Sequence, residues 1–305
     1  MKNSSVTGII VTEHFLFRRI VLSKRELEKH IEVQRSIIKK YRKQIWGKFV
    51  QAIQEFEMVE ENDKIAVCIS GGKDSMLLAK CMQELKRHSE TNFDLIFIVM
   101  DPGYNPQNRQ RIIDNSKLME IPIEIFESNI FNVVSDIKEN PCYLCARMRR
   151  GCLYEYAQSR GCNKISLGHH FDDIIETLLM SILYGSQIQG MLPKLMSTNH
   201  PGMELIRPLS FVKEKDIINW SVSNELEFIR CACRFTEGLD LGRENSKRQE
   251  IKKLIKDLKK IYPTIDMNIY RSMYNVNLDM LIGYKKDGVR YSYLDDYKEK
   301  LGEKK

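Results

Sequence analysis

The sequence lacks any run of about eighteen apolar residues, which is the length that a transmembrane helix needs. It also lacks a leader of basic and then apolar residues, because Glu13, Arg18 and Arg19 interrupt the first apolar stretch. It has no internal repeat and no low-complexity segment. We therefore expect a cytosolic protein without a membrane partner. In the cytosol, eight cysteines are expected to be metal ligands, redox groups or buried thiols rather than a disulfide framework.

The charge balance is moderately basic. Lys and Arg number 48 against 41 Asp and Glu, which gives a net charge of +7. Such an excess suits a nucleic acid or another polyanionic partner without identifying one. The length of 305 residues allows one large domain, or one domain with appendages, around a sizeable core.

The most informative stretch is SGGKDS at residues 70–75. It follows an apolar run at 64–69 and precedes residues 76–85, in which apolar side chains recur at helical spacing. A strand, a glycine turn and a helix are therefore predicted. Glycines let the backbone approach a ligand, and the free N–H groups of the first helical turn attract an anion. The pattern favours a phosphate site over an ordinary serine-capped helix.

A Walker A loop does not fit these residues. With Gly72 and Lys73 as its GK pair, that motif would need glycine at position 67 and Ser or Thr at position 74. The sequence has Val67 and Asp74 at those positions. The predicted phosphate loop is therefore one short turn that contains an acidic residue.

Strand and helix patterns alternate beyond this loop. Residues 94–101 form a continuous apolar run that is typical of a strand buried on both faces of a parallel sheet. The alternation predicts an α/β fold with a doubly wound, mainly parallel sheet. Asp101 ends its strand and should face the nucleotide, because the carboxyl ends of such strands line the ligand crevice. Further strands are predicted at 122–127 and 164–167, and helices at 106–119, up to about 137, and at 143–159.

The chain is expected to have three parts. They are a basic helical segment at 1–56, a nucleotide-binding domain at 57–230 and a helical segment at 231–305. The helical patterns at 23–56 and 242–261 both carry basic residues around an apolar face, so each is either an RNA surface or the solvated face of a packing helix. Residues 184–203 are expected to be a long functional loop without regular structure.

The string GHHFDDIIET at residues 168–177 follows a predicted strand and opens another helix. One interpretation makes Asp173 an N-cap and Glu176 its capping-box partner, with no chemistry. The other places imidazoles and carboxylates at the ligand edge of the sheet. Asp172 or Asp173 would then be a metal ligand or a proton acceptor.

Four cysteines form two short motifs. Cys142 and Cys145 make a CxxC at a predicted helix start, and Cys231 and Cys233 lie far downstream. Their spacing fits a structural zinc site, a redox CxxC, or a 4Fe-4S cluster on three cysteines with one iron free of protein ligands. The remaining cysteines are predicted to be small buried groups: Cys68, Cys81, Cys152 and Cys162.

From about residue 45 to residue 234 the sequence resembles the tRNA 2-thiocytidine synthetase family of PP-loop ATP pyrophosphatases. The family ends its cysteine pattern with a second CxxC, whereas this chain has Cys231, Ala232 and Cys233 before Arg234. The motifs that carry the resemblance are SGGKDS at 70–75, CxxCxRxRRG at 142–151, GHHxDDxxET at 168–177, GMLPKLMS at 190–197, IRPL at 206–209 and the cysteine at 231.

The resemblance implies an ATP site and an iron–sulfur site. Lys73 would neutralise charge on the pyrophosphate and Asp74 would hold Mg²⁺, with both counted as catalytic alongside Asp172 and Asp173. Other nucleotide contacts are expected from Ser70, Gly71, Gly72, Ser75, Asp101, Gly168 and His169. The 4Fe-4S cluster would be held by Cys142, Cys145 and Cys231, with Cys233 as a substitute, and tRNA contacts are expected from Arg147, Arg149 and Arg150.

The activity that the resemblance implies is ATP-dependent tRNA thiolation. A base carbonyl oxygen would be adenylated and replaced by sulfur, with 2-thiocytidine in the anticodon loop as the expected product. The expected partners are tRNA and a sulfur donor, either a persulfide carrier or sulfide, and a homodimer is compatible with this activity. The alternatives are a PP-loop enzyme that thiolates another tRNA base or a small metabolite, and a zinc-stabilised protein that binds ATP and RNA.

Overall fold

The computed structural model describes residues 28–128, 130, 141–229 and 247–300. Its centre is a six-stranded sheet with the strand order β3-β2-β1-β4-β6-β5. All neighbouring strands are parallel except β5 and β6, which are antiparallel. The predicted α/β class is therefore confirmed. The strands are β1 (Lys64–Ile69), β2 (Asp94–Asp101), β3 (Ile123–Glu127), β4 (Lys164–Ser166), β5 (Lys194–Met196) and β6 (Glu204–Ile206).

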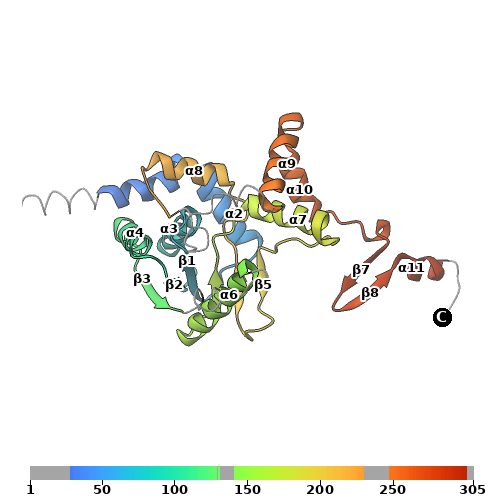
Figure 1. The fold of residues 1–305 in the computed structure, drawn as a ribbon, viewed down its shortest axis with the longest axis horizontal. Coiled ribbons are helices and arrows are strands. Elements are labelled where there is room, and N and C mark those ends of the chain that lie inside the picture. The colour runs from blue at the N-terminus through green and yellow to red at the C-terminus, as the bar shows by residue number, and fades with distance from the viewer. Residues whose placement is uncertain (1–27, 129, 131–140, 230–246, 301–305) are drawn as a thin grey trace, which may run out of the picture.

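Helices cover both faces of this sheet (Figure 1). Side chains alternate between the faces of a strand, so β1 contributes to two cores. Val67 belongs to the larger core with α3 and the N-terminal helices, and Ala66 belongs to a second core with Ala157 of α6. The helices that follow the strands are α3 (Lys73–His88), α4 (Pro106–Leu118), α6 (Pro141–Ser159), α7 (Phe171–Gly185) and α8 (Glu214–Ser223).

The predicted N-terminal helical region packs on the same core as the sheet. Its described part is helical at 28–35, continues through two π-helical turns, η1 (Ser36–Lys40) and η2 (Arg42–Trp46), and ends in α2 (Gly47–Glu55). Ile37, Ile45 and Phe49 are fully buried in the larger core. Burial of this apolar face accounts for the helical pattern in the sequence.

The described part of the C-terminal segment begins with two helices, α9 (Lys247–Ile261) and α10 (Ile265–Ser272). Both pack against α7, where Ile251, Ile255 and Tyr270 join Phe171 in a separate apolar cluster. Part of the basic helix predicted at 242–261 is therefore observed, with Ile251 and Ile255 buried and Leu254 and Leu258 exposed.

Two predictions about the later chain are wrong. The stretch expected to be a loop at 184–203 contains β5, which adds an antiparallel strand to the edge of the sheet. The last forty residues, expected to be helical, contain a β-hairpin of β7 (Gly283–Lys286) and β8 (Val289–Ser292). This hairpin lies between η5 (Leu278–Met280) and α11 (Tyr293–Lys300). The Asp287-Gly288 turn, with φ of 51° and 79°, explains the hairpin, because Asp-Gly is a strong signal for this type of turn.

The cysteines expected to be structural are mostly enclosed. Cys68, Cys81 and Cys162 are buried, whereas Cys152 is partly accessible. Burial raises the pKa of the Cys162 thiol to about 11, so this group stays protonated and unreactive at neutral pH. Among the described residues, no helix is both long and apolar enough to cross a membrane.

The turn after β4 approaches the start of α3 so closely that only glycine fits. A Cβ atom on Gly168 would lie 3.0 Å from the backbone nitrogen of Ser75 and 3.1 Å from the carbonyl carbon of Asp74. Backbone atoms of a helix cannot move away as a flexible side chain can. Gly168 therefore lets two strand ends of the sheet share one site.

We expect Gly168→Ala to lower the free energy of unfolding by roughly 1–3 kcal/mol, because the added methyl group forces α3 and the β4 turn apart. Urea unfolding measures this change. Gly151→Ala in α6 is the matched control, since no atom lies within 4 Å of its Cβ position. That helical substitution should instead stabilise the protein by roughly 0.5–1 kcal/mol, and a similar loss in both variants would contradict the steric explanation.

Candidate functional site

The phosphate loop joins β1 to α3. Gly71 has a φ of +80°, and a Cβ atom there would lie 2.5 Å from Ile112 and 2.7 Å from Ile229. The Ser75 hydroxyl accepts a hydrogen bond from the Ser70 backbone N–H at 3.1 Å and donates to the Gly72 carbonyl at 2.9 Å. The loop is therefore closed by its own serine and has no room for larger residues. Its backbone is preorganised as the sequence predicts for a phosphate site.

Lys73 and Asp74 stand at the start of α3. The Lys73 ammonium lies 3.1 Å from Asp74 Oδ2 and 3.3 Å from Glu214 Oε1 of α8. The other carboxylate oxygen, Asp74 Oδ1, is buried and has no hydrogen-bond partner. A buried carboxylate oxygen that accepts no hydrogen bond is costly, so this atom fits a bound cation.

The GHHFDDIIET string begins α7, but its cap differs from the prediction. His170 is the N-cap: its Nδ1 accepts from the Asp173 N–H at 3.4 Å, and its own N–H donates to Asp173 Oδ2 at 3.0 Å. The expectation that Asp173 caps the helix with Glu176 as its partner is therefore wrong. Asp is preferred over His at N-caps, and this preference led to the prediction of Asp173. The helix in fact begins three residues earlier, so that His170 is the cap.

The two aspartates of this motif have different partners. Asp172 Oδ2 accepts from the backbone N–H of Glu214 at 2.7 Å, which ties α7 to the first turn of α8. Asp173 Oδ1 lies 2.8 Å from the Arg248 guanidinium of α9. Burial would raise the pKa of Asp173, but His170, its backbone N–H and Arg248 outweigh burial and hold that pKa below its usual value. Asp173 is thus a fixed anion that positions neighbouring groups.

His169 precedes the cap residue His170 and is half-buried. Burial, followed by the nearby Arg207 charge, lowers the pKa of His169 to about 4. The imidazole is therefore neutral at physiological pH, and its buried Nδ1 has no hydrogen-bond partner. A neutral ring with an unused nitrogen can accept or donate one hydrogen bond to a ligand.

Three charged residues that sequence reasoning did not assign to the site complete the network. Lys252 of α9 lies 3.0 Å from Glu214 Oε2 and 3.7 Å from Glu176 Oε1. Burial would raise the pKa of Glu214, but Lys252 and Lys73 hold it below its usual value. The sequence did not indicate that Glu214 belongs to the site. An acidic residue in the first turn of a helix is common, because it interacts favourably with the helix dipole.

Asp101 ends β2 as predicted, yet its carboxylate is turned into the protein. Oδ1 accepts from the N–H groups of Gly103 at 2.8 Å and of Tyr104 at 2.7 Å, and Oδ2 lies 3.6 Å from Arg109. The side chain therefore shapes the loop after β2.

The iron–sulfur prediction concerns residues that the structure describes only in part. Cys142 and Cys145 lie in the first turns of α6, and their side chains lie outside the part that the structure describes. Cys231 and Cys233 lie outside the described residues. Within the described side chains no group of three or more metal-binding residues is present. Of the three predicted tRNA contacts on α6, Arg147 and Arg150 are exposed, and Arg149 Nη2 lies 3.5 Å from the Tyr104 hydroxyl.

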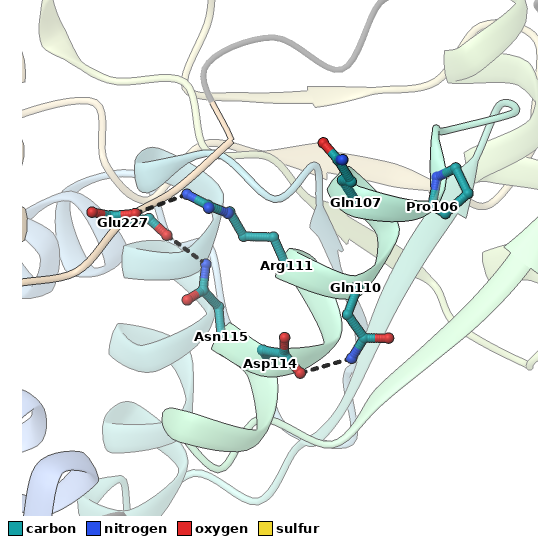
Figure 2. Close-up of a pocket in the computed structure, with 7 residues that line it drawn as sticks. All are labelled: Pro106, Gln107, Gln110, Arg111, Asp114, Asn115 and Glu227. Carbon is teal, nitrogen blue, oxygen red and sulfur yellow. Dashed lines mark hydrogen bonds and ion pairs between the residues drawn. The ribbon is translucent and has the colours of Figure 1, made fainter.

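The segment that leads to Cys231 is anchored beside the phosphate loop. Ile229 donates its N–H to the Gly71 carbonyl at 3.3 Å. Figure 2 shows the other anchors: Glu227 pairs with Arg111 of α4 at 2.9 Å, and its carbonyl accepts from Asn115 at 2.9 Å. These contacts border a hollow of about 620 Å³ on the outer side of α4. Because no residue of the phosphate loop lines this hollow, we place the site at the glycine turn and not there.

Comparison with known proteins agrees with this geometry. The model of the PP-loop domain family matches residues 41–233. The chain is 35% identical over 241 residues to the tRNA-cytidine(32) 2-sulfurtransferase of Coxiella burnetii (strain RSA 331 / Henzerling II), covering 77% of this chain and 90% of that protein. It is 38% identical over 232 residues to the protein of the same name from Yersinia pestis (strain Pestoides F), covering 74% and 71%.

A solved structure with a similar fold is the U34-tRNA thiolase of Methanococcus maripaludis with its 4Fe-4S cluster. It has a TM-score of 0.60 and 20% sequence identity to this chain, and the match covers 75% of this chain and 78% of that one. At this level of identity the likeness concerns the fold alone.

The buried Glu176 makes stability depend on pH. Burial raises the pKa of its carboxyl from 4.5 to about 7, although Lys252 and Arg248 act against the shift. Between these pH values the folded protein keeps a proton that the unfolded chain releases, so stability falls as pH rises. We expect the free energy of unfolding of the wild type to fall by roughly 1–3 kcal/mol relative to Glu176→Gln between about pH 4.5 and 7.5.

Urea titrations of both proteins at several pH values measure this difference. The exposed Glu155→Gln is the control and should follow the wild type at every pH. Parallel curves for wild type and Glu176→Gln would show that the carboxyl does not titrate in this range.

Proposed function

The chain belongs to the PP-loop domain family and, within it, to the family of the tRNA-cytidine(32) 2-sulfurtransferases, and on this premise we propose that it is an ATP-dependent tRNA sulfurtransferase. It acts in the cytoplasm on a cytidine of the tRNA anticodon loop, and its sulfur comes from a persulfide carrier or sulfide. The observation that carries the proposal is Asp74 Oδ1, which stands beside Lys73 at the end of a glycine turn. It is buried, makes no hydrogen bond and lies 3.9 Å from His170 Nε2.

The residues of the glycine turn fit ATP with Mg²⁺. Gly71 allows the left-handed turn of the loop and its close packing against Ile112 and Ile229. Asp74 Oδ1 is the kind of hard oxygen donor that Mg²⁺ prefers. Lys73 supplies positive charge beside it. In the free protein Lys73 is held by Asp74 and Glu214, so it is positioned before the nucleotide arrives. An adjacent neutral imidazole at His169 offers a further hydrogen bond.

The chemistry of the cysteine set fits an iron–sulfur cluster. Thiolates are the ligands of such clusters, and a CxxC at the start of α6 places two thiols where the helix dipole favours their anionic form. Cys231 is the proposed third ligand, with Cys233 as a substitute. Cys231 follows Ile229 by two residues, and two residues of chain span at most about 7 Å. When bound, the cluster would supply a sulfur nucleophile.

The chain's own residues explain how the first step is promoted. The target carbonyl oxygen attacks the α-phosphorus of ATP, and pyrophosphate leaves with negative charge. Lys73 stabilises that charge in the transition state, and Asp74 would hold a Mg²⁺ ion, which would supply further positive charge there. Asp173 with Arg248 keeps this helix start in place. In the second step sulfur at the oxidation level of sulfide would form a bond to the activated carbon, and the C–O bond to AMP would break. Asp172, whose second oxygen is not bound to α8, is the proposed acceptor of the proton that a hydrosulfide loses in this step.

Nucleoside mass spectrometry of total tRNA tests the function directly. Cells that lack the protein should lose 2-thiocytidine, and they should regain it when the gene is restored. Loss of a different thionucleoside would assign the enzyme to another base. Unchanged thionucleosides, together with a colourless protein that contains zinc, would refute the proposal in favour of a protein that binds ATP and RNA.

The ATP site and the cluster site should fail independently. We expect Lys73→Ala to reduce pyrophosphate release by roughly 100- to 1,000-fold, because it removes one charge that stabilises the transition state, while bound iron stays unchanged. Cys142→Ala should lose iron and its visible absorption but still bind ATP. Iron analysis and pyrophosphate release in anaerobic protein measure both properties, and equal loss of both in each variant would contradict two separate sites.

A further inference from the structure

The positive charge of the chain is concentrated in its C-terminal segment. Residues 247–305 hold fifteen Lys or Arg and nine Asp or Glu, a net charge of +6 against +7 for the whole chain. On α9, Lys253 and Lys256 are exposed and form no ion pair with the described residues. The rest of the chain is therefore close to neutral, and a polyanion would be attracted to this segment.

The β7–β8 hairpin carries an uncompensated pair of like charges. Lys285 on β7 lies directly opposite Arg290 on β8. Both side chains are exposed, and neither forms an ion pair within the described part of the chain. Like charges at directly opposed positions destabilise a strand pair. An anionic partner between them would turn this repulsion into binding energy.

The opposite face of the hairpin presents aromatic rings. Tyr284 and Tyr291 stack across the strands with their centroids 4.9 Å apart and an angle of 11° between the rings. Tyr293 and Tyr297 of α11 are 50% and 56% exposed beside it. Exposed tyrosines next to Lys and Arg are the combination on which unpaired RNA bases stack while phosphates meet the basic groups.

The hairpin also stands away from the sheet and its covering helices, as Figure 1 shows. Most residues of its two strands are exposed, so it has little core of its own. Two-stranded hairpins are marginally stable in water, and a partner surface would stabilise this one.

We propose that the β7–β8 hairpin, together with the exposed lysines of α9, is a docking surface for the substrate tRNA. This inference rests on the proposed function and adds the surface that holds the RNA outside the catalytic site. The surface starts at that site, because α9 contacts it through Arg248 at 2.8 Å from Asp173 and Lys252 at 3.0 Å from Glu214. Bound tRNA would therefore reach both the site that α9 contacts and the hairpin.

A second copy of the chain is the other occupant to consider. Met280 and Ile282, which lie before β7, are 80% and 87% exposed and would suit an apolar contact. Pairing hairpin with hairpin would, however, bring Lys285 and Arg290 of both copies together. The charge thus favours RNA as the occupant.

The test uses the full-length double variant Lys285→Gln/Arg290→Gln and measures its affinity for unmodified tRNA over a series of salt concentrations. Removing two phosphate contacts should weaken binding roughly 10- to 100-fold near 0.1 M salt and lower the slope of log K against log salt by about two. Nucleotide affinity should stay at the wild-type value, because the hairpin is outside the ATP site. The variant is expected to fold, since it removes a repulsion.

The matched control is Lys117→Gln/Lys215→Gln, which removes the same charge from exposed positions on α4 and α8. It should keep the wild-type salt slope. Equal slopes for the hairpin variant and the control would overturn the docking surface alone. A wild-type chain that fails to bind tRNA would overturn the proposed function with it. If Ile282→Ser lowers the oligomeric mass while the hairpin variant keeps full tRNA affinity, the hairpin is an interface between copies and the proposal is wrong.

Discussion

The site depends on the close approach of backbone segments around the start of α3. Gly168 brings the turn after β4 against the backbone of Asp74 and Ser75, and Gly71 lets Ile229 pack onto the phosphate loop. Contacts between backbones leave no freedom for side chains to adjust. They therefore place the ATP loop, the GHHFDDIIET turn and the chain leading to Cys231 in one fixed arrangement.

Charge then connects the helices that these turns bring together. Lys73 of α3, Glu214 of α8 and Lys252 of α9 form a chain of ion pairs, with distances of 3.3 and 3.0 Å. Glu176 and Asp173 join the same network through Arg248. Because these groups are partly buried, each stabilises the others, and the loss of one would leave a charge with less compensation. Helix α9 is for this reason part of the site and not only a C-terminal appendage.

The remainder of the C-terminal segment has a different design. Its hairpin is exposed, its basic residues are unpaired among the described residues, and its tyrosines stack on each other. Folding alone stabilises such a surface little, and a polyanionic partner would stabilise it more. The protein therefore combines a site whose acidic and basic residues form a network of ion pairs with an open surface where the basic residues Lys285 and Arg290 form none with the described residues.

The sequence by itself determined the local elements of the nucleotide domain and the phosphate loop. Strand β1, the SGGKDS turn and α3 follow from residues adjacent in the chain, because turn chemistry and periodicity act over short distances. Only the tertiary structure decided that His170 and not Asp173 caps α7, and that Asp101 points into its own loop. It also decided that Glu214 and Lys252 join the site, since ion pairs between helices depend on packing that no short sequence pattern encodes. The Asp287-Gly288 turn is a hairpin signal that the sequence contains, but the helical pattern of the neighbouring residues led to the prediction of a helical segment.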